Sequence, residues 1–225
     1  MVIPKLEIAC FNLESAIRAQ LGGADRIELC ENRLAGGVTP SFELMKQATE
    51  KISIPIHIMI RPRGGNFMYS LEEFEEMKRK MTAFKNAGID GFVFGILNES
   101  HKVDIEKNKE LISLSNNLPC TLHKAFDCTN DLSESLEDAV KCGFSTILTS
   151  GGKWNAEEGL SNLSDLIRSA SGRIEIMPGG GIRSSNIILL KEKLHAPFYH
   201  SSAVTDESDM LDSGEVIVLK QLLLS

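Results

Sequence analysis

The sequence predicts an α/β protein of the (β/α)8-barrel class, because a short apolar strand and an amphipathic helix alternate along the chain. Eight such units follow one another, and the strand starts lie about 28 residues apart. A glycine-led turn of similar sequence precedes three strands: Gly23-Ala24-Asp25, Gly88-Ile89-Asp90 and Gly143-Phe144-Ser145. No linker divides the units, so residues 1–225 are expected to form a single domain.

The predicted strands are short apolar runs at residues 5–10, 26–30, 54–62, 91–96, 120–127, 146–151, 173–179 and 198–203. Pro55, Pro119 and Pro197 stand at the start of three of them, where a missing backbone N–H is least costly. A doubly wound open sheet is the alternative arrangement. It is less favoured because the units look alike and no GxGxxG fingerprint follows the first strand.

Helical periodicity fills the segments between the strands. The clearest helix follows Ser70, a suitable N-cap, and places Phe74, Met77, Met81 and Phe84 on one stripe. The other predicted helices begin near Asn12, Ser41, Asp104, Asp131, Ala156, Ser184 and Ser213.

The composition excludes several classes of partner. Acidic residues outnumber basic ones by 31 to 24, and no Lys/Arg run offers nucleic acid a binding surface. The apolar stretches are too short to cross a membrane, and the N-terminal segment does not read as a signal peptide. Five cysteines without paired spacing indicate reduced thiols and a cytoplasmic location. Whether the chain forms a homo-oligomer stays open.

The inward face of the predicted strands is unusually polar. If the apolar positions of each strand face the helices, the barrel lumen receives the alternate residues: Glu7, Arg26, Glu28, His57, Met59, Arg61, His123, Ser150, Glu175 and Met177. One interpretation is a structural lattice of ion pairs, in which we expect Glu7 or Glu28 to hold Arg61. The other is a catalytic pocket near the strand ends that contains Glu7, Glu28, Arg61, His123 and Asp127.

A glycine run at the end of the seventh strand predicts an anion site. Gly179, Gly180 and Gly181 allow backbone N–H groups to approach an anion, and the following helix would add its positive end. Ser201 and Ser202, after the eighth strand, offer hydroxyl groups to the same place. The alternative is a simple tight turn.

Two further pairs could carry chemistry. His123 and Asp127 could act as an acid–base pair or as metal ligands, although a hydrogen-bonded core histidine is the alternative. Cys10 and Cys30 end neighbouring strands, and thiolates would favour Cu(I). Strand alternation places Cys10 on the helix side with Ile8, so a two-thiolate site would require the strand end to twist.

Several strings together resemble the CutC family, named for copper homeostasis. They are Leu6-Glu7-Ile8-Ala9-Cys10, Gly22–Cys30, Gly36–Pro40, Met59–Gly65, Leu148–Gly152 and Met177–Gly181. The resemblance covers about residues 5–205 and implies a TIM-type barrel, a cytoplasmic location and a role in handling copper, with Cys10 and Cys30 as the Cu(I) ligands. Two positions depart from the family pattern: Lys124 replaces an arginine, and Ser201 replaces a glycine.

Two functions are therefore expected as alternatives. The first is Cu(I) binding through Cys10 and Cys30. The second is a barrel enzyme that acts on a small anionic or phosphorylated metabolite through the charged lumen and the glycine run. The charged lumen favours the enzyme, whereas the family resemblance favours copper.

Overall fold

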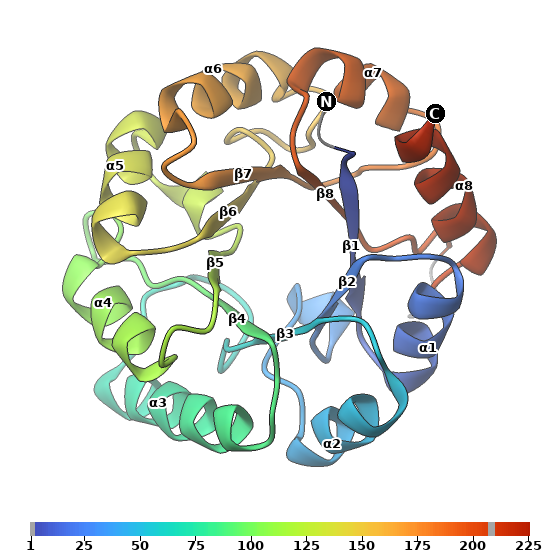
Figure 1. Ribbon diagram of the computed structural model, residues 1–225. Helices are drawn as coiled ribbons and strands as arrows, with labels where there is room; N and C mark the ends of the chain where they lie inside the picture. The colour runs from blue at the N-terminus through green and yellow to red at the C-terminus, as the bar shows by residue number, and fades with distance from the viewer. Residues whose placement is uncertain (1–2, 207–209) are drawn as a thin grey trace.

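Eight parallel strands form one sheet that wraps into a barrel in the computed structural model, which describes residues 3–206 and 210–225 (Figure 1). The strand order is β7-β6-β5-β4-β3-β2-β1-β8, and β7 and β8 lie side by side where the sheet closes. The strands are β1 Lys5–Cys10, β2 Arg26–Leu29, β3 Ile56–Met59, β4 Gly91–Phe94, β5 Cys120–Leu122, β6 Thr146–Thr149, β7 Glu175–Pro178 and β8 Phe198–Ser201. The predicted TIM-type (β/α)8 barrel is confirmed.

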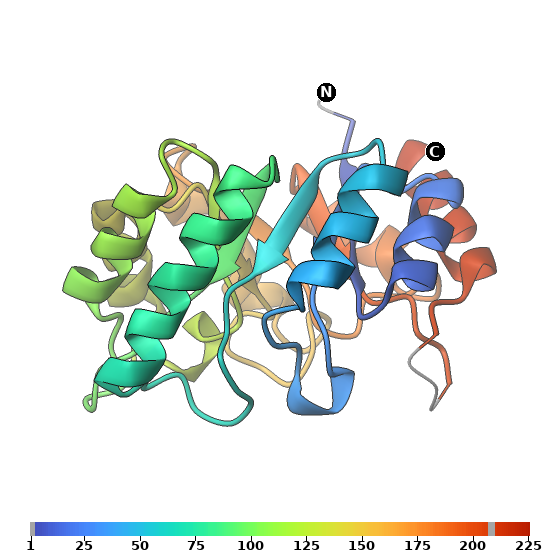
Figure 2. The same ribbon diagram turned by 90° about the horizontal axis from the view of Figure 1, so that it is seen from below.

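A helix follows each strand and lies along the outside of the barrel (Figures 1 and 2). The α-helices are α1 Leu13–Leu21, α2 Phe42–Lys51, α3 Leu71–Asn86, α4 Ile105–Leu114, α5 Leu132–Cys142, α6 Leu160–Ala170, α7 Ile187–Leu194 and α8 Ser213–Leu224. Two short 3-10 helices, η1 Arg33–Ala35 and η2 Phe126–Cys128, lie in the loops after β2 and β5. In the described residues, no helix combines the length and the apolar character needed to span a membrane.

Helix α3 shows how the sequence starts these helices. The Ser70 side chain accepts a hydrogen bond from the Glu73 amide, and the Glu73 carboxylate accepts one from the Ser70 amide, which completes a capping box. The predicted stripe of Phe74, Met77, Met81 and Phe84 is buried against the barrel. The helix therefore begins and packs as its periodicity predicts.

The main hydrophobic core lies between the strands and the helices. Residues at alternate strand positions, including Leu6, Ile8, Ile27, Ile58 and Phe92, belong to it. A second, small apolar cluster of Cys30, Met59 and Val93 lies in the lumen, and the half-buried Phe11 packs against it. As predicted, one set of alternate strand residues points outward and is apolar, whereas the other set gives the lumen both polar and apolar side chains.

Every strand after β1 ends earlier than predicted, and at β3 and β5 this moves site residues into loops. Strand β5 stops at Leu122, and the chain then turns because the Phe126 amide bonds back to the His123 carbonyl. Asp127 therefore lies in η2, and the prediction that it follows His123 on one strand face is wrong. Arg61 lies beyond the end of β3. Helix α7 begins only at Ile187, so the glycine run does not open it directly.

Candidate functional site at the barrel mouth

A cavity of about 210 Å³ lies at the carboxyl ends of the strands. We call its strand residues the floor, which includes Glu28 and His200. We call the loop residues on its polar side the rim: Lys124, Gly180, Gly181, Arg183 and Ser202. Phe11, Met59 and Phe67 form an apolar wall. The active sites of TIM barrels occupy this same end of the barrel.

Beneath the cavity, Glu7 joins three neighbouring strands. The strand register places Glu7 opposite Arg26 on β2 and opposite His200 on β8, so the three side chains share the lumen face. Glu7 Oε2 accepts a hydrogen bond from Arg26 Nε, and Glu7 Oε1 accepts one from His200 Nδ1 at 2.8 Å. Burial alone would raise the pKa of Glu7, but the Arg26 charge and the His200 hydrogen bond lower it to about 2. Glu7 is therefore a carboxylate within a buried ion-pair network.

Glu28 lies one layer higher and lacks such a network. Its side chain is buried, and its Oε2 has no hydrogen-bond partner among the described residues. Burial raises the pKa of Glu28 to about 7, against the attraction of His200 and Arg26. One ligand atom each from Glu7, Glu28 and His200 lies within 4.8 Å of the others. The carboxyl group of Glu28 and the imidazole of His200, both in the floor, thus lie close to the Glu7 carboxylate beneath it.

Arg61 does not pair with a carboxylate among the described residues, and the expectation that Glu7 or Glu28 holds it is wrong. Its Nη1 donates to the carbonyls of Ala35, Gly36 and Gly37 at 2.9 to 3.0 Å, and its Nη2 donates to that of Gly65 at 3.0 Å. The short β3 lets the side chain reach the loop after β2. Arg61 therefore ties the loops after β2 and β3 together.

His123 lines the cavity and is a neutral imidazole. Its Nδ1 accepts a hydrogen bond from the Ala125 amide at 3.3 Å, and its ring centre lies 4.8 Å from that of Phe67. Its buried Nε2 has no partner in the described part of the chain. Burial, and then the Arg61 charge, lower the pKa of His123 to about 3. The nitrogen Nε2 is thus an unsatisfied polar atom of a residue that lines the cavity.

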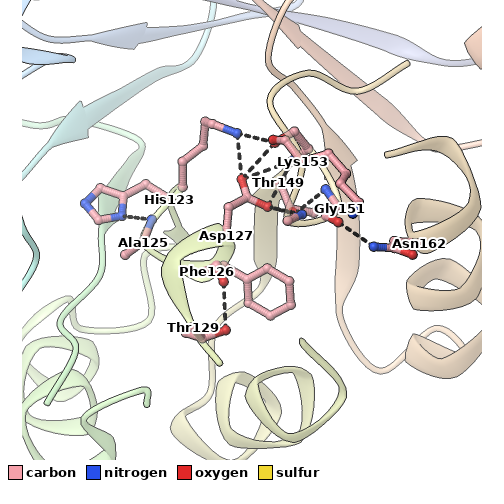
Figure 3. Close-up of polar contacts among 12 residues, drawn as sticks. His123, Ala125, Phe126, Asp127, Thr129, Thr149, Gly151, Lys153 and Asn162 are labelled. Carbon is pink, nitrogen blue, oxygen red and sulfur yellow. Dashed lines mark hydrogen bonds and ion pairs between the residues drawn. The ribbon is translucent and has the colours of Figure 1, made fainter. Parts of the chain in front are cut away.

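Asp127 forms a clasp with the loop after β6 and does not reach His123. Its carboxylate accepts hydrogen bonds from the hydroxyl of Thr149 and from the amides of Ser150 and Gly152. It also binds Lys124 Nζ at 2.6 Å. In Figure 3 the carboxylate points towards Thr149 and Gly151, and the His123 ring points away from it. The structure therefore does not form the predicted His123–Asp127 pair, because both carboxylate oxygens are engaged elsewhere.

The glycine run contributes two amides to the rim. Gly180 and Gly181 have positive φ angles of 92° and 71°, and neither amide has an acceptor within the described residues. Gly179 lies outside the cavity lining, and its amide donates to the Thr149 carbonyl. Ser202 lines the rim with a half-buried side chain. The structure thus gathers most of the predicted anion site around one cavity.

Three rim and floor residues were not predicted for the site: Lys124, Arg183 and His200. Lys124 Nζ bonds to Asp127 and to Ser150 Oγ at 2.6 Å, and a Cβ on Gly180 would lie 3.4 Å from it. Ser201 lines the cavity, but its hydroxyl donates to the Ile182 carbonyl and accepts from Arg183. A sequence signal existed for His200, because it alternates with the outward-facing Tyr199 on β8.

Cys10 and Cys30 stand at the ends of the neighbouring strands β1 and β2, but their side chains lie on different sides of the sheet. The Cys10 thiol belongs to the outer core and donates to the Ile8 carbonyl at 3.5 Å. The Cys30 thiol packs in the lumen with Met59 and donates to the Cys10 carbonyl at 3.6 Å. Burial raises the pKa of both thiols well above the usual value. A two-thiolate site would therefore require one side chain to change sides.

Comparison with known proteins identifies the family. A model of the CutC family matches residues 4–205. The copper homeostasis protein cutC homologs of Mus musculus and Homo sapiens are each 43% identical over 198 residues, which is 88% of this chain and 73% and 72% of those proteins. The crystal structure of the putative copper homeostasis protein CutC from Streptococcus agalactiae superposes with a TM-score of 0.84 at 32% identity, over 91% of this chain and 100% of that chain.

More distant barrels share the fold alone. Phosphoribosyl anthranilate isomerase from Thermotoga maritima has a TM-score of 0.65 at 13% identity, over 98% of both chains. The extent of the family match and the identity to its members decide the assignment. The chain belongs to the CutC family.

Proposed function

We propose that the barrel mouth binds a small anionic metabolite and catalyses a reaction on it. The observation that carries this proposal is the composition of one cavity. Two amides that find no acceptor in the described part of the chain lie on its rim with two basic side chains, and a buried carboxyl group and two imidazoles lie deeper. A barrel interior that serves stability alone is filled with branched apolar side chains.

The rim supplies the binding energy for an anion. Gly180 and Gly181 present N–H groups, and Lys124 and Arg183 line the same rim with positive charge. Charge-assisted hydrogen bonds to an anion are the strongest contacts available there. A phosphate or carboxylate group of the metabolite would therefore bind at the rim.

The floor and the adjoining His123 supply groups for proton transfer. His123 Nε2 and Glu28 Oε2 are buried atoms without partners among the described residues, and both side chains line the cavity. Imidazole and carboxyl groups are the usual general acids and bases of enzymes. The part of the metabolite that reacts would lie against them, with its anionic group held at the rim.

The cavity also limits the size of the metabolite. Its volume of about 210 Å³ is below the roughly 300 Å³ at which pockets for drug-sized ligands begin. A phosphorylated or carboxylated compound of a few carbons is the class that fits.

Titration of the protein with inorganic phosphate tests the anion site. Lys124→Met should weaken binding about tenfold, because it removes one charge-assisted contact. Lys46→Met, a substitution of an exposed lysine on α2, is the matched control and should bind as the wild type does. Absence of phosphate binding, or equal binding by Lys124→Met, would count against the proposal.

Copper binding is the second candidate, and two observations favour it. Relatives carry the name copper homeostasis protein, and the side chains of Cys30 and Met59 belong to one small buried cluster in the lumen. These soft donors suit Cu(I), with Cys10 as the further ligand if the end of β1 turns. We expect weak, two-coordinate binding at most, because the folded protein holds both thiols buried and protonated.

A Cu(I) titration against a competing chelator tests this candidate. The double variant Cys10→Ser/Cys30→Ser should lose the binding, and Cys128→Ser, at an exposed thiol, should retain it. Equal affinity of the double variant and the wild type would remove both cysteines from any copper site.

We also infer a cytoplasmic location, which the five free thiols support.

A further inference from the structure

We propose that a divalent transition-metal ion binds between Glu7, Glu28 and His200, at the boundary between the ion-pair network and the cavity floor. This site is separate from the two cysteines and goes beyond the proposed anion-binding function. It does not depend on the rim, because none of its ligands belongs to the loops after β5, β6 or β7.

The strand register creates the geometry of the site. Glu7 and His200 are direct neighbours across β1 and β8, and Glu28 follows on β2 opposite Ala9. Glu7 Oε1 and His200 Nδ1 lie 2.8 Å apart. Donors bound to one zinc ion at the tetrahedral angle lie roughly 3.4 Å apart, because each bond is about 2.1 Å long. An ion can therefore replace the proton between these two atoms with little movement.

The third ligand comes from Glu28, a side chain with one oxygen that the fold leaves unsatisfied. Glu28 Oε2 is buried and has no donor among the described residues, yet one Glu28 oxygen lies within 4.8 Å of the ligand atoms of Glu7 and His200. The Arg26 guanidinium donates its hydrogen bond to Glu7 Oε2 and therefore does not satisfy Glu28 Oε2. A buried carboxylate needs a compensating cation, and an ion at this place would supply it.

The donor set selects the kind of ion. Two carboxylate oxygens and one imidazole nitrogen suit borderline ions such as Zn²⁺, Fe²⁺ and Mn²⁺, whereas Cu(I) prefers sulfur. Glu28 and His200 line the cavity, so a water molecule or a substrate oxygen could reach a fourth position on the ion. Arg26 fixes the orientation of Glu7 from behind, as partners of metal ligands commonly do.

Calorimetric titration of the metal-free protein with Zn²⁺ tests the site. The wild type should bind one ion, and Glu28→Gln should weaken that binding about tenfold or more. Glu192→Gln, the same change at an exposed position on α7, is the control and should not alter the affinity. Wild-type protein that takes up no ion, or a Glu28→Gln affinity equal to that of the wild type, would overturn the proposal.

A Co²⁺ spectrum of the wild type gives a test that needs no variant to fold. Oxygen and nitrogen ligation should give d–d bands without a sulfur-to-cobalt charge-transfer band. A charge-transfer band would overturn the proposal and point to the cysteines. Lys124→Met should keep its Zn²⁺ affinity while it loses phosphate affinity, so failure of the anion site and failure of the metal site are distinguishable.

Discussion

His123 illustrates at the scale of one residue how burial sets a protonation state. The folded protein holds the imidazole neutral, with a pKa of about 3, whereas the unfolded chain protonates it near its ordinary value of 6.5. Between these values the unfolded state binds more protons. The stability that His123 contributes is therefore complete above about pH 6.5 and is lost as the pH falls towards the folded pKa.

The variant His123→Asn should remove this dependence while its side-chain oxygen can still accept from the Ala125 amide. Relative to this variant, the wild type should lose about 1.4 kcal/mol of unfolding free energy per pH unit below pH 6.5. Urea unfolding at several pH values measures the difference. Parallel curves for the two proteins would mean that water reaches the ring and that it titrates normally.

At the scale of the elements, the clasp of Asp127 joins two barrel units. One carboxylate holds the loop after β5 to the loop after β6 and also holds Lys124 on the rim. Asp127→Asn replaces charge-assisted bonds by neutral ones and introduces donors that face the amides of Ser150 and Gly152. We expect a loss of about 2 kcal/mol in unfolding free energy and weaker phosphate binding, because Lys124 loses its orientation.

The matched control for this prediction is Asp165→Asn, which breaks an exposed i,i+3 ion pair with Arg168 on α6. That change should cost well under 1 kcal/mol. Chemical denaturation and phosphate titration of both variants provide the comparison. If Asp127→Asn resembled Asp165→Asn in both measurements, the clasp would be of no consequence for the rim.

The element scale also explains where prediction from the sequence ends. Alternation within the strands correctly assigns Leu6, Ile8 and Ile27 to the outer core, because a strand has only two faces. The alternation of side chains between two faces does not hold beyond the last residue of a strand. Arg61 and Asp127 are held by loop carbonyls and amides, and those contacts depend on turns far apart in the sequence.

At the scale of the whole molecule, the barrel itself was predictable because its evidence is repeated. One strand–helix unit alone is compatible with several folds. A series of units of similar length and pattern is compatible with few folds other than a barrel. The cavity was only partly predictable. His200 and Glu7 are 193 positions apart, and their contact follows from barrel closure rather than from any local signal. The sequence indicates a polar lumen and a glycine-rich rim, whereas the closed sheet determines which groups meet.

The contact between Glu7 and His200 has a consequence for synthesis of the protein. Strand β1 leaves the ribosome well before β8, because Glu7 and His200 are 193 positions apart. In a nascent chain that lacks β8, strand β1 has an unpaired edge. The Glu7 carboxylate, which is buried in the folded protein, is then exposed to water. Contacts of such long sequence separation form late and slowly. The site that would bind metal thus forms only after β8 has been released and has paired with β1.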